Sequence, residues 1–69
     1  MPFANLKVPA ASVTAEQKQG MVDTVTDMYV GIYGEQARPN VMVLIDEVVD
    51  GGWGIAGNVL TLEMLKGEG

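Results

Sequence analysis

The chain has 69 residues, of which 48% are hydrophobic, and it carries a formal net charge of −5. This length predicts a single domain, residues 1–69, with too little interior to bury so many apolar side chains. It contains no cysteine and no histidine, so we expect association between copies, rather than disulfides or metal ions, to stabilise the fold. Only four side chains are cationic, which argues against a nucleic-acid partner.

The first predicted element is a strand over residues 2–8, where Ala4, Leu6 and Val8 alternate with other side chains. A period of two is typical of a strand with one more apolar face. The sequence Pro-Ala-Ala-Ser at residues 9–12 then breaks the pattern.

A long helix is predicted over residues 15–33. Thr14, followed three residues later by Gln17, is a capping-box signature for its start. Apolar side chains then recur at helical spacing as far as Tyr33, and Gly34 is a typical residue just beyond a helix end.

The second half of the chain predicts a further strand and a hairpin. A turn at residues 38–40 precedes an apolar run over residues 41–45, which predicts a strand buried on both faces. Two strands joined by a helix form a β-α-β unit with parallel strands, an α/β (α+β) fold, and two strands need a second protomer to complete a stable sheet. The glycine-rich run 51–57 indicates a bend or short hairpin, and residues 58–65 fit either a strand or a short helix.

Pro2 is the candidate for chemistry at neutral pH. If Met1 is removed, the chain begins with a secondary amine, and an α-amino group titrates near pH ~7.7 to 8.0 or lower where apolar neighbours desolvate it. The chain has no histidine, and unshifted carboxylates, lysines and tyrosines titrate far from neutrality. A proline at position 2 is by itself common, so this hypothesis depends on the rest of the pattern.

Four segments together resemble the 4-oxalocrotonate tautomerase family: Pro2 opening a strand, residues 14–18 opening the helix, Ile45-Asp46-Glu47 in the second strand, and Trp53-Gly54-Ile55-Ala56-Gly57. The resemblance implies a β-α-β protomer that pairs its strands with a second protomer, commonly in a hexamer made of three dimers. It also implies a cofactor-independent reaction in which the amino-terminal proline moves a proton within an enol or 2-oxo acid. Some relatives hydrate or dehalogenate unsaturated acids.

The chain departs from that family at its substrate-binding arginines. The two positions that typically hold arginine correspond to Ala11 or Ser12 and to Met42. We therefore expect Ser12 and Met42 to line the site. Arg38 is the local cation that could replace the missing arginines, although an arginine in a turn is more commonly exposed to solvent without such a role. Trp53 is expected at the wall of the proline pocket, where it would lower the local polarity, or at a contact between subunits, or both.

Two functions remain open on these grounds. The first is a keto-enol tautomerase acting on a small enolisable 2-oxo acid, or an aryl analogue, with one carboxylate at most. The second is a non-catalytic scaffold subunit of a tautomerase-like oligomer, or a relative with hydratase or dehalogenase chemistry.

We expect no metal at Asp46, Glu47 and Asp50, since adjacent strand residues point to opposite faces. The sequence has no apolar run long enough to span a bilayer, which predicts no membrane partner and a cytoplasmic location.

Overall fold

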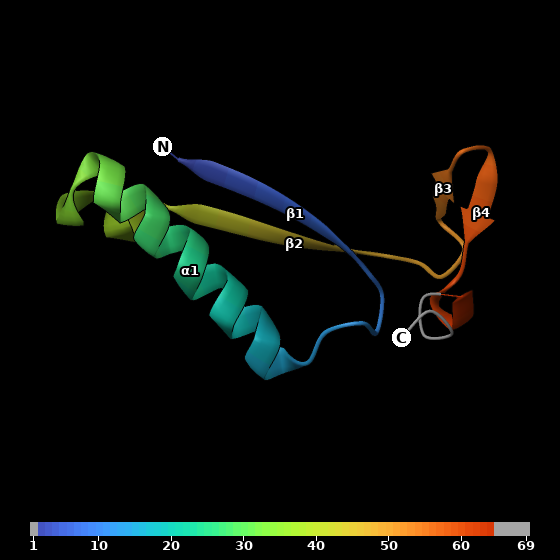
Figure 1. Ribbon diagram of the computed structural model, residues 1–69. Helices are drawn as coiled ribbons and strands as arrows, with labels where there is room; N and C mark the ends of the chain where they lie inside the picture. Colours follow the sequence, from blue (N-terminus) through green and yellow to red (C-terminus); the bar gives the residue numbers. More distant parts are fainter. Residues whose placement is uncertain (1, 65–69) are drawn as a thin grey trace.

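The computed structural model describes residues 2–64 and places the elements in the order strand, helix, short 3-10 helix and three strands (Figure 1). They are β1 (Phe3–Pro9), α1 (Ala15–Tyr33), η1 (Glu35–Asn40), β2 (Met42–Val48), β3 (Trp53–Ile55) and β4 (Asn58–Leu60). β1 pairs with β2 in one sheet, and β3 pairs with β4 in another. The predicted α+β fold with a β-α-β arrangement is confirmed.

β1 and β2 run parallel in a register that aligns Phe3 with Met42 and Pro9 with Val48. β2 extends to Val48, beyond the apolar run over residues 41–45, and each of the two acidic residues that follow this run has a cationic partner. On one face Lys7 Nζ lies 2.6 Å from Asp46 Oδ2, and on the other Lys18 Nζ lies 2.9 Å from Glu47 Oε2. Adjacent strand residues point to opposite faces, which agrees with the resemblance that placed Ile45-Asp46-Glu47 in this strand.

α1 has the predicted bounds, and its capping box is formed. Thr14 Oγ1 accepts a hydrogen bond from the Gln17 backbone N–H (3.0 Å), and Gln17 Oε1 accepts one from the Thr14 N–H (2.8 Å). The helix ends where Gly34 adopts φ +99°, a region that favours glycine, and the Gly34 N–H donates to the Val30 carbonyl. Local sequence signals therefore fix both ends of this helix.

The run over residues 51–57, predicted as a bend or short hairpin, contains β3 and the turn of a hairpin, and its second strand β4 lies just beyond it. Its turn residues Ala56 and Gly57 have φ values of 51° and 81°, as in the two-residue turns that suit the twist of paired strands. The stretch from residue 58, which fitted a strand or a helix, contains both, because β4 is followed by a helical turn at residues 62–64. Leu65 lies outside the described residues. Asp50 Oδ1 accepts a hydrogen bond from the Leu62 N–H (2.7 Å) and ties this turn to the base of the hairpin.

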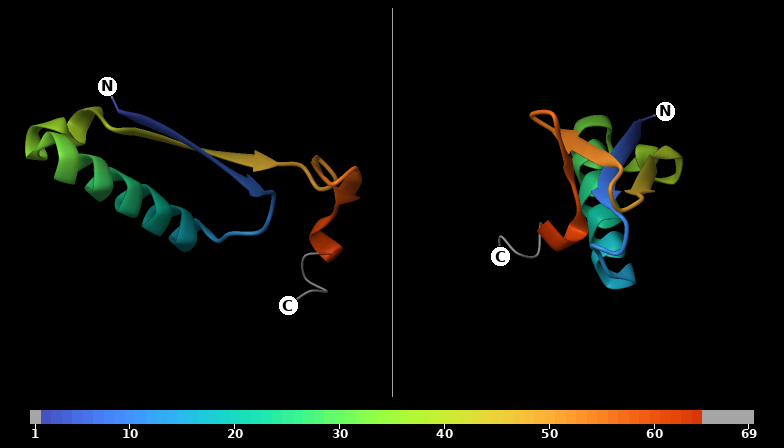
Figure 2. Two further views of the ribbon diagram at one scale, coloured as in Figure 1. Left: turned by 45° about the horizontal axis from the view of Figure 1, so that its top comes forward. Right: turned by 90° about the vertical axis from the view of Figure 1, so that its right-hand side faces the viewer.

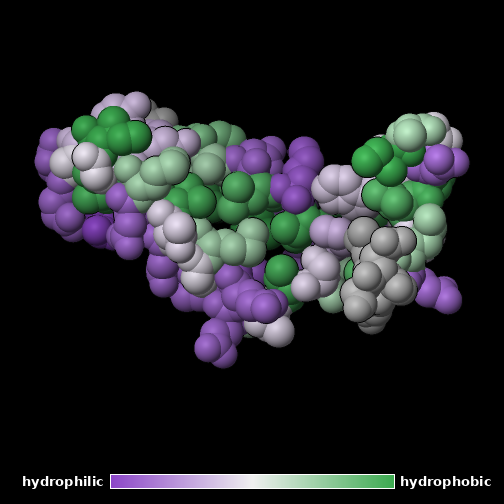
Figure 3. Space-filling model, viewed as in Figure 1, coloured by the Kyte–Doolittle hydropathy of each residue, from purple (hydrophilic) through white to green (hydrophobic). Residues whose placement is uncertain are grey.

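α1 covers one face of the β1–β2 sheet, and the hairpin lies beyond the end of β2 (Figure 2). No residue in the range 2–64 is fully buried. The prediction that the second strand is buried on both faces is wrong for the single chain: Met42 is 52% exposed and Leu44 47%, because they point away from α1. Apolar surface accordingly extends over the strands and the hairpin in Figure 3.

The dimensions of the chain agree with this lack of a core. Its radius of gyration is 15.0 Å, whereas a compact domain of this length would have about 11 Å. Within the described residues, no helix is both long and apolar enough to cross a membrane.

Replacing Thr14 by alanine should lower the free energy of unfolding by about 1 kcal/mol, because the Gln17 N–H at the start of α1 loses its acceptor. The measurement is urea denaturation of wild type and variant at equal protein concentration. Thr14→Ser keeps a hydroxyl acceptor and is the matched control. Equal stability of the alanine and serine variants would contradict the capping role.

Candidate active site

Pro2 directly precedes β1 and borders a depression together with the segment that joins α1 to β2. Its carbonyl accepts a hydrogen bond from the Met42 N–H at 3.0 Å. This bond begins the parallel ladder between the two strands and fixes the backbone of Pro2. Because proline has no freely rotating side chain, its ring nitrogen is held as firmly as the strand end itself.

A surface depression of about 460 Å³ opens beside Pro2. Its lining consists of Pro2, Tyr33, Gln36, Ala37 and Asn40. None of these side chains carries a formal charge at neutral pH. If Met1 is removed, the backbone nitrogen of Pro2 becomes an amine, which is charged when protonated. The end of α1 and the η1 segment therefore provide the wall, and the start of β1 provides the candidate base.

Two tyrosines on α1 lie near this end of β1, a feature that sequence reasoning missed. The Tyr29 hydroxyl donates to the Phe3 carbonyl at 3.3 Å, and the Tyr29 and Tyr33 rings stack with their centroids 6.4 Å apart. The spacing of four residues places both on one helix face. In the sequence they contributed only to the apolar stripe, and their approach to Pro2 depends on the tertiary fold.

Arg38 belongs to η1, but its guanidinium is engaged with two carboxylates. Arg38 Nε lies 2.6 Å from Glu35 Oε1, and Nη1 lies 3.0 Å from Asp27 Oδ1. The hydrogen bond and charge of Arg38 lower the pKa of the Glu35 carboxyl, and the carboxylates raise the pKa of the guanidinium. Arg38 does not line the depression beside Pro2.

Ser12 and Trp53 lie at the opposite end of the strands. Ser12 Oγ donates to the Pro9 carbonyl at 2.6 Å, beyond the end of β1, and Trp53 pairs with Leu60 in the hairpin. A seven-residue strand is roughly 20 Å long at ~3.3 Å per residue, so one chain does not bring these side chains to its own Pro2. Trp53 Nε1 is buried and has no hydrogen-bond acceptor among the described residues. Of the five expected site residues, only Pro2 lines the depression. Met42 meets Pro2 through its backbone N–H and its side chain is not part of the lining, and Arg38 lies at the same end of the sheet.

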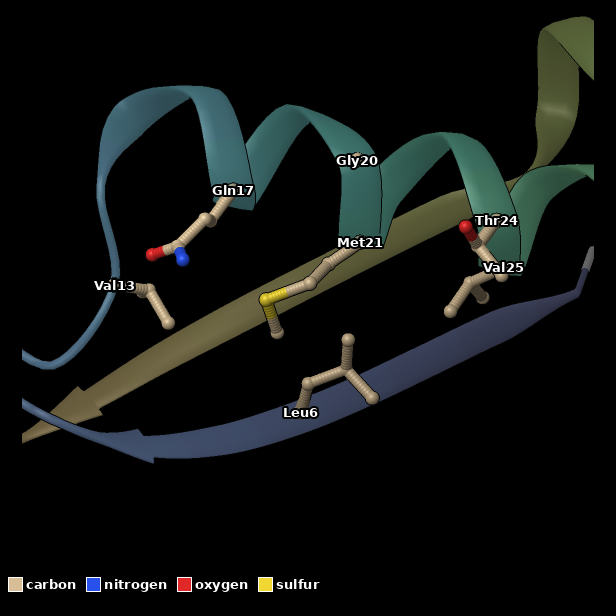
Figure 4. A pocket seen from close by; sticks show the side chains of 7 residues that line it. All are labelled: Leu6, Val13, Gln17, Gly20, Met21, Thr24 and Val25. Carbon is tan, nitrogen blue, oxygen red and sulfur yellow. The ribbon is translucent and has the colours of Figure 1, made fainter. Parts of the chain in front are cut away.

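A second hollow, of about 590 Å³, lies between α1 and β1 (Figure 4). It is lined by Leu6, Val13, Gln17, Gly20, Met21, Thr24 and Val25. Its walls are almost entirely apolar, and the Gln17 carboxamide is already used in the helix cap. No lining side chain titrates, so we place no chemistry there.

Comparison with known proteins identifies relatives of the chain. The family described as tautomerase enzyme matches residues 2–63. A probable tautomerase of Dickeya dadantii is 41% identical over 61 residues, covering 88% of this chain and 90% of that protein. A probable tautomerase of Helicobacter pylori is 37% identical over 59 residues, covering 83% of this chain and 85% of its own.

Solved structures give the same result. One, from work on the 4-oxalocrotonate tautomerase isozymes of Methylibium petroleiphilum, superposes with a TM-score of 0.73 at 31% identity, covering 93% of this chain and 97% of that one. DmpI from Helicobacter pylori superposes with a TM-score of 0.75 at 28% identity, covering 99% of this chain and 100% of that one. The family match spans nearly the whole chain, including the strand that opens with Pro2 and the hairpin, and the chain therefore belongs to the tautomerase family.

Proposed function

We propose that Pro2, freed of Met1, is the general base of a cofactor-independent keto-enol tautomerase. The observation that carries this proposal is the position of Pro2 at a fixed strand end, lining an uncharged depression in a chain of the tautomerase family. A neutral secondary amine among apolar and uncharged neighbours has a pKa at or below the usual α-amino range, because desolvation disfavours its cationic form. Such a base is matched to proton transfer at neutral pH.

The proposed step moves one proton and needs no co-reactant. The Pro2 nitrogen takes the proton from the enol hydroxyl, and the electron pair of that O–H bond forms the carbonyl π bond. The electron pair of the carbon–carbon double bond then takes the proton from the proline ammonium to form a C–H bond. Pro2 ends neutral, and enol and ketone differ only in the position of the proton.

The carboxylates near this end of the sheet are already engaged. Glu35 and Asp27 are both bound to Arg38, and the pKa of Glu35 is lowered. A carboxylate held in its charged form by an arginine accepts a proton less readily than a free one. Pro2 is therefore the group in the described part of the chain that best fits the role.

The substrate we propose is an enolisable 2-oxo acid, or an aryl analogue, with one carboxylate at most. Arg38, the only arginine of the chain, is already held by two carboxylates, so a substrate anion would have to displace one of them. Met42, at one expected arginine position, presents an apolar side chain that is half exposed. Among the residues that line the depression, a second carboxylate would find no charged side chain, and an unpaired carboxylate is costly to desolvate.

We further propose that a second copy completes the sheet, in a homo-oligomer built from dimers. The Pro2 carbonyl and the Ala10 N–H both face β2, and backbone groups alternate in direction along a strand. The backbone groups of Phe3, Asn5 and Lys7 therefore face the open edge of β1. Two antiparallel β1 strands centred on Asn5 would pair Phe3 of one copy with Lys7 of the other.

Two further observations support this edge as the interface. The apolar hollow between α1 and β1 borders the same edge, and it includes Gly20, whose missing side chain leaves open space on the helix (Figure 4). The apolar face of β1 and β2 that points away from α1 is also exposed. In such an assembly, Ser12 and Trp53 would reach the Pro2 site of another copy. A hexamer remains the predicted size of the assembly.

The cytoplasmic location of the protein stays a prediction.

Pro2→Ala should lower the rate of phenylenolpyruvate ketonisation by more than about tenfold, because the primary amine it leaves is less rigidly placed. The wild-type rate should increase with pH as a single group loses its proton, with a pKa at or below ~7.7 to 8.0, since only the deprotonated amine accepts a proton. Stopped-flow absorbance measures both, and intact mass verifies the removal of Met1. Equal rates for the two proteins would favour the scaffold function.

Asn5→Pro should shift the protein from oligomer toward monomer, because it removes the N–H at the centre of the proposed strand pairing. Asn5→Ala, which keeps the N–H, is the matched control. Analytical ultracentrifugation across micromolar concentrations measures the assembly. If this edge faced solvent, proline would be tolerated there, so an unchanged oligomer in Asn5→Pro would contradict the proposed interface.

A further inference from the structure

We propose that Tyr33 and Asn40 form a pair of uncharged hydrogen-bond donors for the reacting oxygen of the substrate, so that the site does not require a substrate carboxylate. This inference rests on the proposed function of Pro2. It assigns substrate contacts to two residues that the sequence did not single out. It also extends the substrate class to uncharged enolisable carbonyl compounds, such as esters of 2-oxo acids.

The electrostatic surroundings of the depression favour an uncharged ligand. Tyr33, Gln36, Ala37 and Asn40, which form the wall opposite Pro2, carry no charge. The charged cluster on the neighbouring residues consists of Arg38 with Asp27 and Glu35, and its formal sum is −1. A substrate that anchored itself by a carboxylate would meet this net negative charge, and no lining residue in the described part of the chain offers it a cationic side chain.

The hydrogen-bonding capacity of the wall is concentrated in two side chains. Gln36 Nε2 donates to the Tyr33 carbonyl at 2.8 Å and is thus already used. The Tyr33 hydroxyl and the Asn40 carboxamide make no side-chain hydrogen bond within residues 2–64. Both can donate, and both line the same depression as Pro2.

Tyr33 is 56% exposed, and its ring has an aromatic neighbour. Its ring stacks on Tyr29, and the Tyr29 hydroxyl is bonded to the Phe3 carbonyl, one residue from Pro2. The stack therefore connects the donor on α1 to the strand that carries the base. A donor with a fixed position stabilises developing charge more effectively than one that must reorient during the reaction.

The step that these donors would assist is the loss of the enol proton to Pro2. As the O–H bond breaks, negative charge grows on the substrate oxygen before the carbon is protonated. Two uncharged donors aimed at that oxygen stabilise the enolate-like transition state more than the ground state. Their loss should therefore lower kcat more than it raises KM.

The experiment compares ketonisation of phenylenolpyruvate and of its methyl ester by wild type, Tyr33→Phe and Asn40→Asp. Asn40→Asp keeps the shape of the side chain but replaces the donor by an acceptor, and Tyr33→Phe keeps the stack but removes the hydroxyl. Each variant should lose about tenfold or more in kcat on both substrates, with circular dichroism and oligomer size unchanged. Gln19→Ala removes an exposed carboxamide from the other half of α1 and is the control.

Wild type should turn over the ester within about tenfold of the acid, whereas a site that anchors a carboxylate would discriminate more strongly. Wild-type kcat in both variants, together with an impaired Pro2→Ala, would overturn this inference and leave the proposed function intact. Rejection of the ester by wild type would also overturn it. An unimpaired Pro2→Ala, or no turnover of either substrate, would overturn both.

Discussion

The parallel pairing of β1 with β2 is the constraint on which the rest of the structure depends. The bond from the Met42 N–H to the Pro2 carbonyl begins this ladder, so the pairing that forms the sheet also places the candidate base. α1 runs back along the sheet from the end of β1 toward the start of β2 and covers one face of the two strands. The segment between α1 and β2 must then lie beside the start of β1, where it forms the wall of the depression next to Pro2.

The same pairing leaves the chain incomplete by itself. Two strands and one helix cannot enclose an interior, and no residue of the described range is fully buried. The exposed apolar side chains occur on the sheet face away from α1, on the hairpin and along one side of the helix. Association of copies would remove this surface from water, at about 25 cal/mol per Å² of apolar area. We therefore regard assembly and the completion of the proposed site as one requirement.

The sequence predicted the elements that local signals specify, and it was less informative where tertiary contacts decide. Thr14, Gln17 and Gly34 determine the ends of α1 through hydrogen bonds and backbone conformation within a few residues. The apolar run over residues 41–45 marks only part of β2, whose full length is defined by its pairing with β1, a strand distant in sequence. Sequence spacing alone could not reveal the wall beside Pro2, which forms only when η1 meets the start of β1.

The titration of the Pro2 nitrogen tests the central claim most directly. The test uses protein labelled with ¹⁵N at proline and free of substrate. The Pro2 resonance should be that of a secondary amine, and it should titrate once, with a pKa at or below the ordinary α-amino range of ~7.7 to 8.0. A lowered pKa would mean that a neutral base is present at physiological pH before any substrate binds. A resonance typical of an amide nitrogen, or a pKa clearly above the ordinary α-amino range, would contradict the account.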